Sequence, residues 1–393
     1  MSLFYSDMTR RLSQPGSDVW GIHDEAVARQ RAGDDIILLS VGDPDFSTPE
    51  YISQYTVEQI NRGRTHYSPP EGEPQLRETI ARLESDLTGK SFSAEQFVVF
   101  PGATATLYSV FASIANPGDE VVVPEPLYAG YRGLFDALGI HDVTVPLSLP
   151  DFELDVAAVF AAVTDTTRAV LVNTPGNPCG NLIPCESLAA LARGCRERDL
   201  WLVCDEVYSL ITFETPHISL LRSTDDLSNV IVIDGLSKSH AMSGWRLGWA
   251  VAPEQLITQL IRVSGATLFG TSQFIQDGAA YALANDGPDV EKMRVEYQRR
   301  RDYAAQRLDA IAGLDYFKPR GGMFMMVDSS RIANDGADFA RRLLDEAGIS
   351  VVPGRGFGES AASYVRVSLT HPVPVLEDVF DRIARVAGHM QRD

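Results

Sequence analysis

The chain has 393 residues, 45% hydrophobic and 22% charged, which is typical of a globular protein with a large core. At roughly 100–200 residues per domain, this length predicts two domains or one large one. The 34 basic and 53 acidic residues give a formal net charge of −19, which argues against nucleic acids and anionic membrane surfaces as partners.

The cysteines are dispersed and show no C-x-x-C spacing; they are Cys179, Cys185, Cys195 and Cys204. This pattern predicts neither a disulfide framework nor a metal site, and it fits a reducing compartment. The polar start of the chain lacks the apolar run of a signal peptide. No stretch reaches the roughly 18 apolar residues of a membrane-spanning helix. We therefore expect a cytoplasmic protein that has no membrane partner.

Residues 1–50 are irregular and rich in Gly, Pro and Asp. Beyond them, short and almost continuously apolar runs alternate with helical patterns. The runs are Phe97–Phe100, Glu120–Val123, Arg168–Val172, Trp201–Cys204 and Val230–Ile233. Such runs are typical of parallel strands that are covered by helices on both faces.

Residues 103–115 show the helical pattern between the first two runs. Leu107, Val110, Phe111 and Ile114 recur at i, i+3, i+4 and i+7, which places them on one face of a helix. The alternation of strands and helices predicts an α/β fold with a mostly parallel central sheet and helices on both faces.

The pattern changes after about residue 290. A long charged helix is expected over Glu291–Arg307, followed by strands at Met323–Val327 and Tyr364–Leu369 and helices at Gly336–Ala347 and Val375–Met390. These elements predict a smaller α+β domain. We assign residues 51–290 to a large domain, and residues 1–50 with 291–393 to the small one.

Several polar motifs follow the apolar runs, where the carboxyl ends of parallel strands form a ligand edge. Pro101–Thr104 precedes the helix at 103–115, whose first N–H groups can bind an anion such as phosphate. Tyr128 follows the second run and can stack on a flat ring. Taken alone, the first motif is a weak signal, and a tyrosine such as Tyr128 is more often a partly buried core residue.

The next two runs end in further candidates. Asn173–Gly180 reads NTPGNPCG, in which two prolines and two glycines predict a tight loop that presents Asn177. Asp205 ends the run WLVCD, where it either caps the following segment or pairs with a cation such as a protonated pyridine nitrogen. Tyr208, three residues on, can donate to a ring oxygen.

The fifth run leads into SKSHAMSGWR, which contains Lys238 and Arg246. A lysine at this edge can be desolvated, which lowers the pKa of its amine and makes it a nucleophile toward carbonyls. Arg246 lies among apolar residues and therefore needs an anionic partner. In YVRVSL, strand alternation places Tyr364, Arg366 and Ser368 on one face. Arg366 either clamps a carboxylate in a cleft or lies solvated at the surface.

Together these motifs resemble the class I/II aminotransferases of pyridoxal-phosphate fold type I, over nearly the whole chain from SVGDPDFSTPE at Ser40 to YVRVSL. The resemblance implies pyridoxal 5'-phosphate as the cofactor and transfer of an amino group from an amino acid to a 2-oxo acid. It implies a homodimer with the active site at its interface.

The resemblance also implies roles at the cofactor ring. Lys238 matches the lysine that forms a Schiff base with the cofactor and then moves the catalytic proton. Asp205 matches the partner of the pyridine nitrogen, and Tyr208 and Asn177 match the donors to the ring oxygen. Tyr128 matches the aromatic side chain that stacks on the ring.

The phosphate and the substrate have their own matches. Ala103, Thr104 and Arg246 correspond to the phosphate cup, and Tyr67 to a tyrosine that reaches the phosphate of the neighbouring subunit. Arg366 corresponds to the arginine that grips the substrate α-carboxylate, with Gly42 and Asn177 in the substrate site as well.

One position departs from the family. Many relatives have a serine three residues before the lysine that contacts the phosphate, and this chain has Gly235. The corresponding bond is then either missing or replaced by Ser237 or by water.

The substrate is indicated by finer similarities. SVGDPDF, SKSHAMSGWRLGW, LFGTSQFIQD and GSDVWGIHDEA are similar to arginine–pyruvate transaminases of bacterial arginine catabolism. Trp20 and His23 belong to the last stretch, and Trp20 either covers the substrate pocket or packs between domains. A cationic substrate needs an acidic partner, for which Glu71 and Glu73 are candidates. Aspartate and aromatic amino acids remain alternatives, and both pyruvate and 2-oxoglutarate remain as acceptors.

Two other functions stay open at this point. A β-lyase would use the same cofactor-binding residues, because fold does not fix function. A non-catalytic ligand sensor would be built on the same domain, but the presence of Lys238, Asp205 and Arg366 opposes that alternative.

Overall fold

The structure is a computed structural model that describes residues 4–13, 20–285 and 287–392. Residues 14–19, which include part of the stretch GSDVWGIHDEA, lie outside the described residues, as do parts of the polar N-terminal stretch. Its central feature is a seven-stranded sheet with the order β2-β8-β7-β6-β5-β3-β4. The strands are β2 (Phe97–Phe100), β3 (Glu120–Glu125), β4 (His141–Pro146), β5 (Thr167–Asn173), β6 (Trp201–Asp205), β7 (Val230–Gly235) and β8 (Gly248–Val251).

The sheet is parallel from β7 to β4, whereas β8 runs antiparallel to both of its neighbours. The expected α/β fold with a mostly parallel sheet is therefore confirmed. The short strand β8 (GWAV) was not expected from the sequence, and its apolar residues carry no sign of its antiparallel direction.

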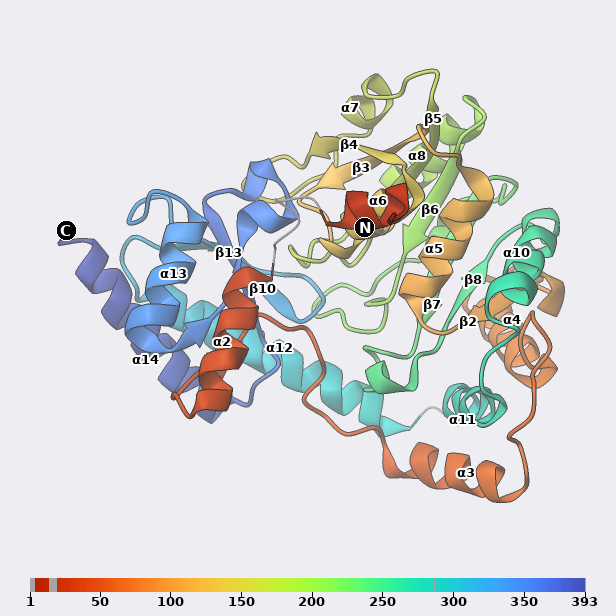
Figure 1. Ribbon diagram of the computed structural model, residues 1–393, viewed down its shortest axis with the longest axis horizontal. Helices are drawn as coiled ribbons and strands as arrows, with labels where there is room; N and C mark the ends of the chain where they lie inside the picture. The colour runs from red at the N-terminus through yellow and green to blue at the C-terminus, as the bar shows by residue number, and fades with distance from the viewer. Residues whose placement is uncertain (1–3, 14–19, 286, 393) are drawn as a thin grey trace.

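Helices cover both faces of this sheet (Figure 1). Successive strand residues alternate between two cores: Val98 and Phe100 of β2 pack in one, and Phe97 and Val99 in the other. Both faces are buried, which explains the unbroken apolar runs. The helices of this part are α3 (Glu50–Asn61), α4 (Pro74–Thr88), α5 (Ala103–Ile114), α6 (Gly130–Leu138), α7 (Val156–Ala161), α8 (Cys185–Arg196), α9 (Leu220–Ser223), α10 (Glu254–Thr267) and α11 (Gln273–Ala284).

A four-stranded antiparallel sheet with the order β12-β13-β10-β9 lies beside the large one, and a short parallel pair joins β1 to β11. The strands are β1 (Ile37–Leu38), β9 (Asp315–Phe317), β10 (Phe324–Asp328), β11 (Ile349–Ser350), β12 (Val352–Pro353) and β13 (Tyr364–Ser368). The helices around them are α2 (Gly21–Ala32), α12 (Pro288–Asp309), α13 (Gly336–Ala347) and α14 (Val373–Met390).

The pairing of β1 with β11 brings the N-terminal segment to the C-terminal elements, and α2 lies against them in Figure 1. Helix α13 has the expected bounds, whereas α12 is longer than expected at both ends. The exact domain division at residues 50 and 290 stays a prediction.

The remaining elements are short. Helix α1 (Asp7–Leu12) lies on α6, where the Arg11 guanidinium donates to the carbonyls of Asp136 and Ala137. Four 3₁₀ turns are η1 (Ala94–Gln96), η2 (Ser243–Trp245), η3 (Gly354–Phe357) and η4 (Glu359–Ala361). All four cysteines have free thiols. Across the described ranges, no helix combines the length and the apolar character needed to cross a bilayer.

Candidate active site

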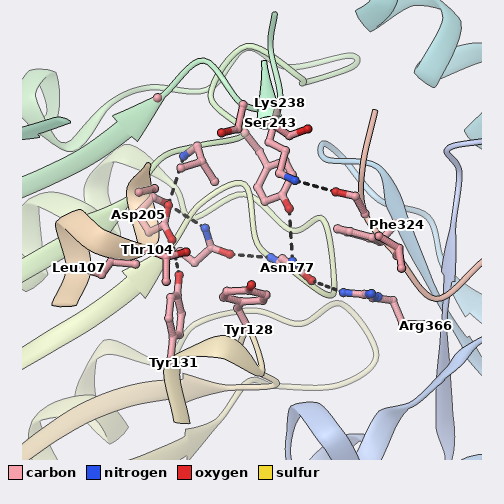
Figure 2. A pocket seen from close by; sticks show the side chains of 18 of the residues that line it. Thr104, Leu107, Tyr128, Tyr131, Asn177, Asp205, Lys238, Ser243, Phe324 and Arg366 are labelled. Atoms are coloured by element: carbon pink, nitrogen blue, oxygen red, sulfur yellow. Dashed lines mark hydrogen bonds between the residues drawn. The ribbon is translucent and has the colours of Figure 1, made fainter. Parts of the chain in front are cut away.

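A cavity of about 280 Å³ lies where the carboxyl ends of the central strands face β10 and β13. Figure 2 shows its side chains converging from both sheets. Twelve of the residues singled out in the sequence line it: Trp20, Gly42, Ala103, Thr104, Tyr128, Asn177, Asp205, Tyr208, Ser237, Lys238, Arg246 and Arg366. The structure therefore brings together motifs that are spread over some 350 residues of sequence.

Lys238 lies in the turn that follows β7. Its Nζ donates to the carbonyl oxygen of Gly42 at 2.6 Å. Burial lowers the pKa of the lysine to about 8, with a further contribution from the charges of Arg366 and Arg246, against the opposing effect of Asp43. A substantial fraction of the amine is therefore neutral near pH 8, as a nucleophile or a proton acceptor requires.

Asp205 ends β6 at the base of the cavity and is 4% exposed. One carboxylate oxygen accepts from the Tyr131 hydroxyl at 2.6 Å, and the other from the Val207 N–H at 3.3 Å. Burial raises the pKa of Asp205 to about 6. A cation beside this carboxylate would offset its desolvation, which fits a protonated ring nitrogen.

Tyr131 is a lining residue that the sequence analysis missed. It lies three residues after Tyr128 in YAGY, at the start of α6, so the i, i+3 spacing was the available signal. Because the bond to Asp205 joins two distant elements, the sequence does not reveal it.

The loop after β5 connects the two ends of the cavity. Asn177 donates to the Tyr208 hydroxyl at 3.3 Å, and its side-chain oxygen accepts from Arg366 at 3.1 Å. Asn173, also missed in the sequence, fixes the loop: its oxygen accepts from the Asn177 N–H at 2.7 Å, and its amide donates to the Asp205 carbonyl at 2.9 Å.

An anion site lies at the start of α5, where Ala103 and Thr104 present the first N–H groups of the helix. Gly102 precedes them with φ +92°, and a Cβ there would lie 2.6 Å from the Arg246 guanidinium. The close approach of Arg246, whose Nη1 donates to the Ser243 carbonyl at 2.7 Å, therefore depends on this glycine. Helix N-terminus and guanidinium together form a cradle that suits a phosphate.

Gly235 is fixed by backbone packing. A Cβ at this position would lie 2.7 Å from the Leu247 carbonyl oxygen and 3.1 Å from the Cα of Gly248, because β7 and β8 pair closely there. The backbone as it stands leaves no room for the serine of many relatives. Ser237 lines the cavity and is available as a replacement.

Arg366 lies in β13 with 2% exposure, so the alternative of a solvated arginine is wrong. Its guanidinium lies 4.0 Å from the ring centroid of Phe324 and 4.9 Å from that of Phe357, and it donates to the Ser40 carbonyl at 2.5 Å. Its Nε has no partner among the described residues. Burial lowers the pKa of Arg366 to about 10. A buried cation with a free donor suits a carboxylate.

Gly42 leaves room for the ring of Phe324, a lining residue that was not expected from the sequence. A Cβ at position 42 would lie 2.1 Å from the Cζ of the Phe324 ring. The glycine therefore lets this ring lie beneath the Arg366 guanidinium, while its carbonyl accepts from Lys238.

Trp20 lies at the edge of the cavity with 37% of its surface exposed. Its ring meets that of His23 edge-on at 5.8 Å. His23 bonds to the Ser40 hydroxyl at 2.8 Å, and the Ser40 carbonyl accepts from Arg366. The start of α2 is thereby linked to the arginine of the site.

Tyr67 does not line the cavity of its own chain. It is 82% exposed and meets Phe269 edge-on at 5.0 Å. Glu71 and Glu73 are not brought to this cavity either: Glu73 is bound by Arg64 at 2.6 Å, and Glu71 lies 4.0 Å from Arg77. Whether these two glutamates meet a substrate from across a dimer stays a prediction.

The donor set fits pyridoxal phosphate from end to end. The α5 N-terminus, Arg246 and Ser237 suit its phosphate, Tyr208 and Asn177 its ring oxygen, and Asp205 its ring nitrogen. Arg366 remains for a substrate carboxylate. When bound, the cofactor supplies an electron sink for the α-carbon of an amino acid.

Comparisons with known proteins agree with this geometry. The family model "Aminotransferase class I and II" matches residues 34–383. The arginine–pyruvate transaminase AruH of Pseudomonas aeruginosa is 41% identical over 98% of each chain. The aspartate/prephenate aminotransferase of Thermus thermophilus is 35% identical over 97% of this chain and 99% of its own.

Solved structures show the same fold. An aspartate aminotransferase from Rhizobium meliloti superposes with a TM-score of 0.93 at 28% identity, covering 98% of this chain and 99% of its own. The Thermus thermophilus aspartate aminotransferase with maleate gives a TM-score of 0.92 at 34% identity, covering 98% of this chain and 100% of its own. The chain is thus a member of the class I and II aminotransferase family, whose enzymes use pyridoxal phosphate.

Proposed function

We propose that this aminotransferase takes arginine or another basic amino acid as its donor and a 2-oxo acid such as pyruvate as its acceptor. The observation that carries the proposal is the convergence of Lys238, Asp205 and Arg366 on one cavity. The donor class is supported by the similarity to the arginine–pyruvate transaminase over 98% of the chain.

Lys238 is the residue that holds the cofactor and moves the proton. Its neutral Nζ accepts the proton from the substrate α-carbon and returns it one step later, which contributes on the order of 10²–10⁴ in rate. Asp205 holds the positive charge of the ring nitrogen. Because it is buried and fixed by Tyr131, removing that charge would leave an uncompensated carboxylate.

Arg366 orients the substrate through its α-carboxylate. The guanidinium stacks on Phe324 and donates to Asn177, which fix its orientation. Its free Nε–H therefore determines where the carboxylate of the substrate binds. Trp20, at the edge of the cavity, covers the bound amino acid and excludes water from it.

The side chain of a basic substrate needs negative charge near the mouth of the cavity. Asp43 supplies it: the residue is exposed, its carboxylate accepts from the cavity-lining Ser243, and its charge acts on Lys238. Asp43 is thus a further candidate for this role beside Glu71 and Glu73.

A half-reaction screen tests the proposal. The cofactor-loaded enzyme is mixed with each amino acid in turn, and the visible absorption of the bound cofactor is followed together with 2-oxo acid formation. We expect stoichiometric conversion that is fastest with arginine or lysine as the donor. In the Asp43→Asn variant, the rate of conversion should fall more for these two donors than for the donor alanine.

Other outcomes assign other functions. Fast conversion by aspartate or aromatic amino acids alone would contradict the basic donor. Release of pyruvate and ammonia from cystathionine without an acceptor would favour the β-lyase. No conversion by any amino acid would favour a ligand sensor.

We also infer a homodimer in the cytoplasm. Tyr67, which is 82% exposed, and Phe269, which is 58% exposed, form an apolar surface outside the cavity that a second subunit would cover. The four free thiols support a reducing compartment.

A further inference from the structure

A second cavity of about 390 Å³ lies on the other side of the strand ends that carry the active site. It shares Gly235 with the first cavity, and its walls include Glu206 and Ser239, the chain neighbours of Asp205 and Lys238. Residues of helix α4, Ile80 to Thr88, line the opposite wall. None of the residues that we assign to the reaction uses this space.

Four carboxyl groups line this cavity; Asp86 is exposed, and two of the other three have partners. Glu206 is 2% exposed; its oxygens lie 3.1 Å from the His217 ring and accept from the Leu220 N–H at 2.8 Å. Burial opposes its charge, but His217 and the backbone hold the pKa of Glu206 below its ordinary value. Asp234 accepts from Ser209 at 3.2 Å and from the Gly235 N–H at 2.7 Å.

The carboxyl group of Glu84 on α4 differs from these two. No group in the described part of the chain donates a hydrogen bond to it or forms an ion pair with it. Burial raises the pKa of Glu84 to about 7, and the nearby Glu206 adds to the effect. A half-buried carboxyl group without a donor is a suitable acceptor for a ligand. If the donor of the ligand is a cation, it also relieves the repulsion between Glu84 and Glu206.

Trp249 provides an independent sign. It lines the cavity from β8 and is 4% exposed, yet its indole N–H has no acceptor among the described residues. Its backbone partner in β7 is Asp234, so the two side chains lie on the same face of the sheet. A buried N–H without an acceptor destabilises the protein unless a ligand or water accepts from it.

The rim of the cavity is apolar. Leu87, Leu210 and Ile218 line it and are 68%, 47% and 37% exposed. Arg222 also lines it and is exposed. Large apolar side chains around a polar recess are typical of small-molecule sites.

We propose that this cavity binds a small amphipathic amine. The ammonium group of this ligand donates to Glu84, and one of its oxygen atoms accepts a hydrogen bond from the Trp249 N–H. Its apolar body packs against the apolar rim, which consists of Leu87, Leu210 and Ile218. The negative carboxyls favour a cation over an anion. Because Glu84 and the Trp249 donor come from different elements, α4 and β8, a molecule with polar groups at both ends can bind to both.

Isothermal titration of the cofactor-loaded enzyme with N,N-dimethyltyramine tests the proposal. This probe carries an amine, an aromatic body and a hydroxyl oxygen, and its tertiary amine cannot form a Schiff base with the cofactor. We expect saturable binding of one molecule per chain, and at least about tenfold weaker binding of 4-ethylphenol, which lacks the amine.

Variants assign the site. Glu84→Gln keeps the shape and is expected to weaken probe binding about tenfold or more, whereas Arg366→Lys in the active site is expected to leave it unchanged. The native enzyme should bind the probe more tightly than N,N-dimethylphenethylamine, which lacks the hydroxyl, and Trp249→Phe should bind the two with equal affinity. The proposal is overturned if the native enzyme shows no saturable heat, if Glu84→Gln binds as tightly as the native chain, or if Arg366→Lys abolishes binding.

Discussion

At the scale of single residues, burial shifts the charge of the groups that we propose to react. Lys238 and Asp205 lie in one cavity, and desolvation shifts the pKa of the lysine down to about 8 and that of the aspartate up to about 6. Both pKa shifts disfavour the charged form of the side chain. A cofactor that binds the neutral amine and places a cation beside the carboxylate would offset both effects.

The lowered pKa of Lys238 predicts how the apoenzyme takes up its cofactor. Only the neutral amine attacks the carbonyl, so the rate of covalent attachment should rise about tenfold per pH unit below pH 8 and level off above it. Rapid-mixing absorbance at a series of pH values measures this rate, with Lys238→Ala as the unreactive blank. A rate that still rises tenfold per unit up to pH 10 would contradict the assignment.

Phe324 is expected to act through Arg366. Phe324→Leu removes the ring beneath the guanidinium, an interaction of roughly 0.5–2 kcal/mol. KM for the amino acid should therefore rise by roughly 2–30-fold, with a smaller change in kcat and an unchanged cofactor spectrum. Phe339→Leu in the buried face of α13 is the matched control. A fall in kcat at constant KM would show that the ring has another role.

At the scale of elements, the active site depends on how closely strands and loops pack. The β7–β8 pairing fixes the glycine at position 235, and the β5 loop joins Asp205 to Arg366 through Asn173 and Asn177. The sheet positions each group by backbone contacts that extend well beyond the motif in which that group stands.

Gly235→Ser tests the packing of β7 against β8. The new Cβ would meet the Leu247 carbonyl, and such overpacking destabilises proteins by about 1–3 kcal/mol. We expect a lower unfolding midpoint in urea for the apoenzyme and no gain in cofactor affinity. Gly265→Ser is the control, because its Cβ would lie 3.9 Å from the nearest atom. An unchanged midpoint with tighter cofactor binding would show that a serine fits.

At the scale of the whole molecule, the chain closes its cavity with segments from both ends. Residues before β2 supply Trp20 and Gly42, and β13 near the C-terminus supplies Arg366. Among the residues matched to the family, Tyr67 lies outside the cavity of its own chain, which supports its placement in a partner's site.

Mixed dimers test this placement. Tyr67→Phe and Lys238→Ala are each expected to impair the homodimer. A hybrid of the two contains one site with native Lys238 and a native tyrosine from the other subunit, so its activity per intact lysine should return to the native value. Hybrids separated by two affinity tags measure this. Activity that stays at the Tyr67→Phe level would place Tyr67 in its own subunit's site.

Much of the site was predictable because its residues stand at strand ends. Apolar runs located β2, β3, β5, β6 and β7 to within a few residues, and the motifs after them lie at one edge because parallel strands end together. Strand alternation identified the face of β13 that carries Arg366. The order of these motifs was sufficient to indicate the family.

Only the tertiary structure decided how these groups are held. The Tyr131 hydroxyl on Asp205, the Phe324 ring beneath Arg366 and the contact that requires Gly42 each join segments far apart in sequence. Local patterns report which face of an element is buried, but they do not report which side chain of another element it meets. The sequence by itself determined the fold class and indicated the groups that we propose to react; the packing between distant segments decided their charge, their orientation and the shape of the space between them.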